Sequence, residues 1–270
     1  MYNKRQRLKT SDLRILLSML NTIEQEEESL TKDILGSEEK RNRLFDPAAP
    51  QQVWAGLYEL PFNQCLATLI NSFGLANCAK QILDSPNRIE ALNSWHEKLQ
   101  TDDSDNQDLN PVLTIEQARF VYSFNTIVVK NLKSLMIYGY YINDLVKIAR
   151  DGPYNERDKA LLKAIKIDPT VILCKTAAQR LSRAVLMHDE GFLKGLRNSL
   201  NGKLGAKEAA TYKKMRYVLQ VLHESDGLKL NDHMLYTLFV KELDLYANNM
   251  EAAKNLLEFT RSFKKKKASI

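Results

Sequence analysis

Apolar residues recur every three or four positions along almost the whole chain, and strict alternation of apolar and polar residues is rare. A period of three to four is that of an α-helix, whereas a strand with one buried face repeats every two residues. The 10 glycines and 7 prolines in 270 residues are too few for the many turns of a β-sandwich or barrel. The sequence therefore predicts an all-α protein, a multi-helix bundle of about ten helices.

The most regular apolar stripe lies near the N-terminus and is interrupted once, at Glu27. Its members are spaced alternately three and four residues apart, which predicts a helix from about Ser11 to Leu35, ended by Gly36. The stripe consists of Leu13, Leu16, Leu20, Ile23, Leu30 and Ile34. Because the other faces are polar, it needs a partner surface. Burial within the chain is favoured because the stripe is short for a coiled coil, and self-association or a protein partner through Leu13, Leu16, Leu20 and Ile23 is the alternative.

The middle of the chain contains several short helices and one long one. The short helices are expected at Val53 to Glu59, Phe62 to Phe73, Ala76 to Leu83 and Arg88 to Leu99. The acidic stretch from Thr101 to Pro111 is interpreted as an exposed loop. Thr114 and Gln117 then form a capping box, and one helix is expected from there to about Arg150. This helix is apolar on nearly all sides, so it is predicted to lie at the centre of the bundle.

Capping residues divide the last part of the chain into further helices. Asp168-Pro169 is predicted to cap one of them, and Thr176 with Gln179 forms a second capping box. The expected helices are Asn155 to Lys166, one from Thr176 through Leu181, Ala184, Val185 and Met187, Phe192 to Leu200, Ala206 to Glu224, Asp232 to Leu243 and Asn249 to Lys265. The chain is thus predicted to comprise an N-terminal amphipathic segment (1–45), a central bundle (46–152) and a basic helical region (153–270).

Charge is distributed unevenly along the chain. Residues 1–150 carry 17 Lys and Arg against 19 Asp and Glu, and residues 151–270 carry 22 against 14. Clustered cations bind phosphates with little dependence on base sequence. The preferred hypothesis is a non-enzymatic binding or regulatory protein that contacts nucleic acid through its basic half; the alternative is a solvated charged face. The candidate residues are Lys175, Arg180, Arg183, Lys194, Arg197, Lys203, Lys207, Lys213, Lys214, Arg216, Arg261 and Lys264.

One short string suggests an enzyme. The eight residues from Ala184 to Gly191 place His188 and Asp189 after an apolar run and before a glycine. The string resembles the His-Asp core of the HD superfamily of metal phosphohydrolases, which implies an all-helical fold and a divalent metal bound by the two side chains. Those enzymes also need an earlier histidine ligand, and the nearest here is His96. The competing interpretation is that Asp189 caps the following helix and His188 occupies the turn.

Other classes of protein have little support. The chain lacks the phosphate-binding, dinucleotide-binding, nucleophile-elbow and zinc-protease motifs, and no cofactor is expected. The three cysteines, Cys65, Cys78 and Cys174, are widely spaced, which favours reduced thiols and a cytoplasmic location. A membrane span is not expected, because Lys130 and Lys133 interrupt the most apolar region. A protein-interaction scaffold or effector-like module that uses the N-terminal helix remains the second hypothesis.

Overall fold

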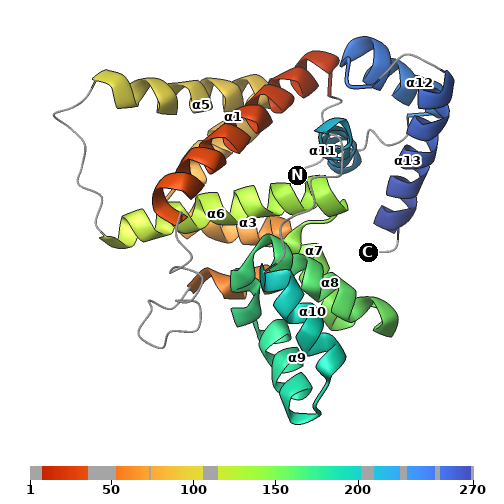
Figure 1. The fold of residues 1–270 in the computed structure, drawn as a ribbon. Helices are drawn as coiled ribbons and strands as arrows, with labels where there is room; N and C mark the ends of the chain where they lie inside the picture. The colour runs from red at the N-terminus through yellow and green to blue at the C-terminus, as the bar shows by residue number, and fades with distance from the viewer. Residues whose placement is uncertain are drawn as a thin grey trace. The chain divides into compact units, whose positions relative to one another are not determined.

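The computed structural model describes residues 8–35, 53–72, 74–105, 115–201, 210–225, 230–246 and 250–268. Every regular element in these ranges is a helix (Figure 1), which confirms the predicted all-α class. The chain forms two compact units. The first unit comprises Met1–Gln25, Leu69–Phe124 and Ala209–Ser269; the second comprises Glu26–Thr68 and Asn125–Glu208. Each unit joins segments from different parts of the chain, and the predicted division into 1–45, 46–152 and 153–270 stays a prediction.

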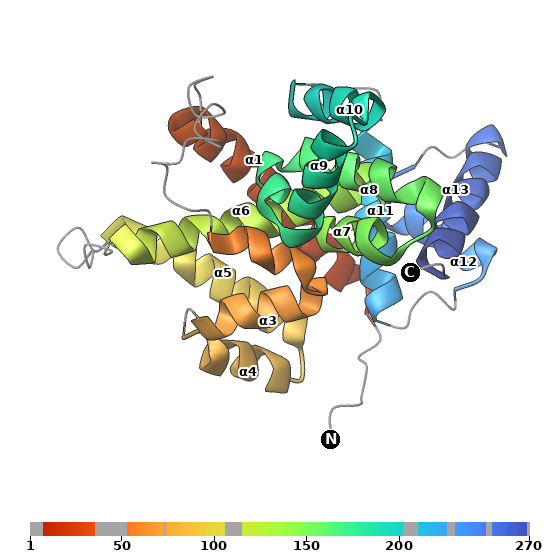
Figure 2. The ribbon, with the colours of Figure 1, turned by 90° about the horizontal axis from the view of Figure 1, so that it is seen from below.

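The first unit is built around helix α11. Its elements are α4 (Ala76–Asp84), α5 (Arg88–Asp105), α11 (Ala210–Glu224), α12 (Asp232–Tyr236), the π-helical turn η5 (Thr237–Glu242) and α13 (Met250–Ala268), with the first part of α1 (Thr10–Leu35). Leu13 and Leu17 of α1 lie in one apolar core with Met215 and Leu219 of α11 and Phe239 of η5. Helix α4 packs against α5 (Figure 2).

Polar contacts fix the start of α1 to η5. The Thr10 hydroxyl donates to the Glu242 carboxylate, and Arg14 Nη2 donates to the Glu242 carbonyl at 2.6 Å. Leu13, Leu16 and Leu20 are buried and Ile23 is half-buried. The structure does not describe the side chains of Leu30 and Ile34. The beginning of the predicted stripe is therefore covered by the chain itself, so it is not a free surface for self-association.

The second unit contains a compact group of short helices. They are η2 (Val53–Glu59), α7 (Ile142–Asp151), α8 (Tyr154–Ile167), η3 (Pro169–Leu173), α9 (Lys175–Leu186) and α10 (Glu190–Asn201). Helix α8 packs against both α7 and α10 (Figure 1). The buried apolar side chains of this unit include Leu145 on α7, Leu161 and Ile165 on α8, and Val171 on η3. Helices α3 (Phe62–Ser72) and α6 (Ile115–Tyr138) each have residues in both units.

The single helix predicted from Thr114 to Arg150 is wrong. Helix α6 ends at Tyr138, Gly139 adopts φ +79°, and a new helix, α7, begins at Ile142. A positive φ is readily adopted by glycine and ends a right-handed helix. The buried Asn131 makes the break stable, because its Oδ1 accepts the N–H of Ile142 at 2.8 Å and thereby satisfies one of the donors exposed at the start of α7.

The other predicted boundaries and caps have different outcomes. Helix α5 continues to Asp105, so the loop predicted from Thr101 is helical in its first part; residues 106–114, with the cap predicted at Thr114, are outside the described ranges. The Asp168 cap is confirmed, since Asp168 Oδ1 accepts the Thr170 N–H at 2.9 Å. The capping box at Thr176 is wrong, because α9 begins one residue earlier, at Lys175.

Candidate binding surface on helices α9 and α10

The predicted basic residues are divided between the two units. Lys175, Arg180, Arg183, Lys194 and Arg197 lie on α9 and α10 of the second unit, and Lys213, Lys214, Arg216, Arg261 and Lys264 lie on α11 and α13 of the first unit. The side chains of Lys203 and Lys207 are outside the described residues. The predicted basic residues thus belong to both units.

Three of the five predicted cations of the first unit contact other residues of that unit. The Arg216 guanidinium lies over the Phe259 ring, 5.4 Å from its centroid. Arg261 pairs with Asp232 at 2.7 Å, and Lys264 Nζ donates to the Leu230 carbonyl at 3.2 Å. These contacts join α11 and α13, or α13 and the segment at the start of α12, so the positions of Arg216, Arg261 and Lys264 are explained without a ligand.

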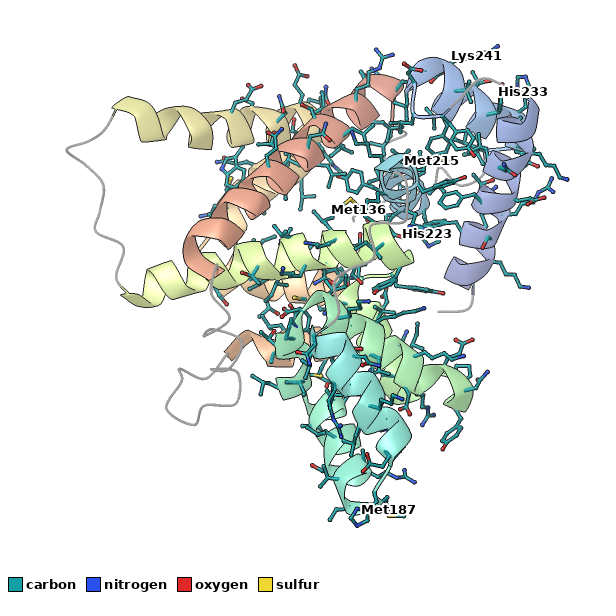
Figure 3. All side chains as sticks on the ribbon, in the orientation of Figure 1. Met136, Met187, Met215, His223, His233 and Lys241 are labelled. Atoms are coloured by element: carbon teal, nitrogen blue, oxygen red, sulfur yellow. The ribbon has the colours of Figure 1, made fainter. Side chains whose placement is uncertain are left out.

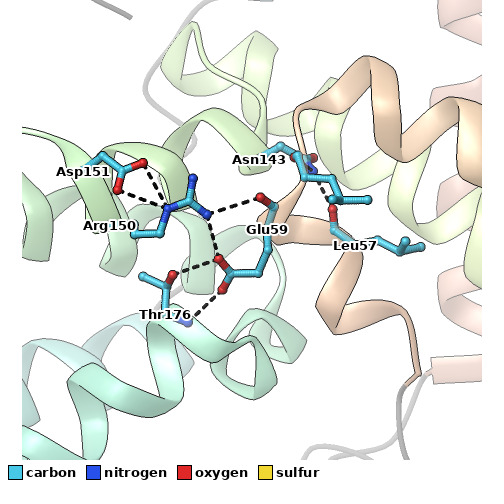
Figure 4. A network of polar contacts seen from close by, with 7 residues as sticks. Leu57, Glu59, Asn143, Arg150, Asp151 and Thr176 are labelled. Carbon is cyan, nitrogen blue, oxygen red and sulfur yellow. Dashed lines mark hydrogen bonds and ion pairs between the residues drawn. The ribbon is translucent and has the colours of Figure 1, made fainter.

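The base of α9 is held by a carboxylate from another element. Glu59, at the end of η2, accepts the Thr176 N–H at 2.7 Å and the Thr176 hydroxyl at 2.9 Å (Figure 4). Arg150 Nη1 also donates to this carboxylate, at 3.1 Å. Burial of Glu59 would raise its pKa, but the hydrogen bonds from Thr176, Cys174 and Arg150 outweigh that effect and hold the pKa below its ordinary value. Glu59 therefore replaces the expected capping box.

Arg180, one of the predicted phosphate-binding residues, is held in the middle of α9. Its guanidinium makes two hydrogen bonds of 2.7 Å to Asp158 of α8 and one of 2.6 Å to Asp189 of the α9–α10 turn. It also lies over the ring of Phe192, 4.1 Å from the centroid. The hydrogen bonds to Asp158 raise the pKa of Arg180, and the bond from Arg180 lowers that of Asp189. Arg180 thus ties α8, α9 and α10 together and is not free for a phosphate.

The remaining cations of α9 and α10 face solvent. Lys175, Arg183, Lys194 and Arg197 are exposed. Helix α9 contains no acidic residue, and α10 contains one, Glu190, which is 3.7 Å from Arg197. Lys194 and Arg197 are three residues apart and so project from the same side of α10. The outer surface of the two helices therefore carries an excess of positive charge.

Helices α9 and α10 pack against each other and form a helical hairpin, and the end of this hairpin carries three exposed apolar side chains. Val185, Leu186 and Met187 are 55%, 78% and 71% exposed, and they are called the apolar tip below. Met187 lies at the end of the hairpin in Figure 3. The sequence predicts Val185 and Met187 on one helix with Leu181 and Ala184, but of these four only Ala184 is fully buried. This exposure is the feature that sequence reasoning missed.

Backbone hydrogen bonds hold the tip in a defined turn. The Asp189 N–H donates to the Ala184 carbonyl at 2.9 Å and the His188 N–H to the Val185 carbonyl at 3.3 Å. This is the pattern of a Schellman motif, whose residue of positive φ is usually glycine. His188 occupies that position with φ +52°, so the turn is formed against a steric cost.

Asp189 caps helix α10 and His188 lies in the turn before it, as the non-catalytic interpretation of the segment 184–191 predicts. Asp189 Oδ1 accepts the Phe192 N–H at 3.1 Å, which is a cap for α10, and its Oδ2 binds Arg180. His188 is exposed. Among the described residues, no three His, Cys, Asp or Glu side chains are grouped closely enough to hold a metal ion.

The cysteines of the second unit are core residues. Cys65 and Cys174 are buried and not in disulfides. Burial raises the pKa of Cys65 to about 11 and that of Cys174 to about 12. At neutral pH both are therefore neutral thiols, which are weak nucleophiles and poor metal ligands.

No protein family, curated protein or solved structure matches the chain. Within the described ranges, no helix combines the length and the apolar character that a bilayer crossing requires.

Proposed function

We propose that the chain is a non-enzymatic binding protein that contacts nucleic acid through the basic outer surface of α9 and α10. The observation that supports the proposal is the exposure of Lys175, Arg183, Lys194 and Arg197 on two helices that carry a single acidic residue between them. Such cations neutralise phosphates and release condensed counterions, which favours binding without preference for a base sequence.

A binding role also agrees with how the ionisable side chains of this unit are used. Glu59 caps α9, Asp158 and Asp189 hold Arg180, and Asp168 caps η3 and accepts a hydrogen bond from the buried Tyr58 hydroxyl. Each of these carboxylates already has a structural partner. Acid and base catalysis would have to use a carboxylate other than these four.

The proposal is tested with the full chain and a variant carrying Arg183→Glu, Lys194→Glu and Arg197→Glu. Anisotropy of labelled random-sequence duplex and single-stranded oligonucleotides should show micromolar binding at about 50 mM salt. With about three phosphate contacts, affinity for the duplex should fall about forty-fold by about 200 mM salt. The variant should lose binding to all sequences alike.

A matched control reverses three exposed lysines of the first unit: Lys80→Glu, Lys241→Glu and Lys254→Glu. It changes the net charge by the same amount as the test variant but leaves α9 and α10 intact. The control should bind as the wild type does. If both variants lost oligonucleotide binding equally, the binding would depend on net charge and not on α9 and α10. Absence of binding by the wild type at low salt would refute the proposal.

A further inference from the structure

We propose that the apolar tip docks on an anionic membrane surface, with Val185, Leu186 and Met187 entering the interface between headgroups and acyl chains. This goes beyond the proposed contact with nucleic acid, because phosphates and cations alone give no reason for three exposed apolar side chains. Among the described residues, seven large apolar side chains are exposed, and three of them are consecutive at this tip. The other four are Leu83, Tyr154, Leu173 and Met234.

The directions of the three side chains favour a fluid surface over a protein groove. Successive side chains on a helix point about 100° apart, so those of Val185, Leu186 and Met187 spread over about 200° around the end of α9. A groove that binds a helix contacts residues spaced three and four apart, along one face. A lipid interface, into which the turn between α9 and α10 dips, covers this whole arc at once.

The charge next to the tip is complementary to anionic lipid. Arg183 lies two residues before the tip and Lys194 lies one turn into α10, and both are exposed. Of the two acidic residues in the turn, Asp189 binds Arg180 at 2.6 Å and Glu190 lies 3.7 Å from Arg197. One helical turn is about 5 Å, close to the depth at which interfacial helices bury their apolar residues. Arg183 and Lys194 would then reach the headgroup phosphates with their long side chains.

The turn holds the tip in this exposed form before any membrane is present. The two bonds of the Schellman motif fix Met187 and His188, and the Asp189 cap starts α10 immediately afterwards. A preformed tip loses little conformational entropy on docking. Three small insertions and a few cations give weak, reversible attachment, comparable to that of a single acyl chain.

The test is co-sedimentation of the full chain with vesicles of phosphatidylcholine, alone or with about 30% phosphatidylserine. The wild type should sediment with the anionic vesicles at about 1 mM lipid and much less with the neutral ones. The double variant Leu186→Ser, Met187→Ser should lower binding at least about tenfold. Arg183→Gln and Lys194→Gln should each lower it about fivefold.

The matched control is Leu83→Ser with Met234→Ser, which removes two exposed apolar side chains of the first unit. It should sediment as the wild type does. Absence of vesicle binding, or binding unchanged in the tip variant, would overturn the inference. It would also be overturned if the tip variant lost nucleic-acid binding but not vesicle binding, or abolished a concentration-dependent dimer of the wild type. The tip variant keeps every cation, so a negative result in the vesicle experiment does not affect the test of nucleic-acid binding.

Discussion

Two runs of large apolar residues in this chain have opposite environments. Leu13, Leu17 and Leu20 of α1 are buried, and the first two lie in a core with α11 and η5. Leu186 and Met187, at the end of α9, are exposed over most of their surface. The chain therefore covers one apolar run and leaves the other in solvent.

The two runs differ in spacing and in what packs against them. The buried residues of α1 are three, four or seven apart, so they form one stripe that a single surface can cover. The residues of the tip are consecutive and lie where α9 ends, and the chain leaves them exposed. Consecutive residues are not exposed as a rule, since Leu238, Phe239 and Val240 of η5 are all buried in the core of the first unit. Neither apolar character nor spacing alone thus predicts burial; it depends on whether another element packs against the residues.

The largest expected effect comes from placing a charge in each run. Leu20→Asp puts an unpaired carboxylate in an apolar environment and should lower the free energy of unfolding by about 4 kcal/mol. Leu186→Asp, at an exposed position, should change it by less than about 0.5 kcal/mol. Urea denaturation followed by circular dichroism measures both. Equal destabilisation by the two substitutions would contradict the comparison.

An intermediate effect is expected at the base of α9, the end of the helix opposite to the tip. Glu59→Ala removes the acceptor of the Thr176 N–H and should cost about 1 to 2 kcal/mol. Glu59→Gln keeps an acceptor oxygen and should cost less. Substitution of Arg150 by Gln is a useful control, because it removes one donor and leaves the cap in place.

The same residue predicts a dependence on pH. The pKa of Glu59 is lower in the folded protein than its ordinary value of 4.5, so the folded state favours the carboxylate. Its stabilising contribution is fully present above pH 4.5 and is lost as the pH falls through the lower, folded value. The stability difference between wild type and Glu59→Gln, measured by urea denaturation from neutral pH downward, should shrink in that range. A difference that grew on acidification would exclude the cap.

The smallest effect is expected at the turn that holds the tip. His188→Gly relieves a positive φ and should raise stability by about 0.5 to 1 kcal/mol. Asp244→Gly is a matched comparison, because Asp244 has φ +50° in the first unit. Thermal melting measures both. A stability loss in His188→Gly alone would show that the imidazole makes a stabilising contact that glycine cannot replace.

Sequence periodicity was most reliable where a single helix carries its own start and stop signals. The N-terminal helix, the helix after Pro153 and the Asp168 and Asp189 caps were all predicted from local residues, and the structure contains them. The long central helix was not predicted correctly, because the apolar pattern continues through Gly139 into the next helix. A glycine inside a periodic run can lie within one continuous helix or between two helices. Here the buried Asn131 favours the break between two helices.

For the candidate site, the sequence alone determined the helical class, the excess of cations after residue 150 and the cap at Asp189, because these depend on composition or on neighbours within a few residues. Only the tertiary structure decided that Glu59 caps α9, that Arg180 is held by Asp158 and Asp189, and that Val185, Leu186 and Met187 remain exposed. Glu59 lies 117 residues from Thr176. Contacts over such separations depend on how helices pack, and no local spacing encodes them.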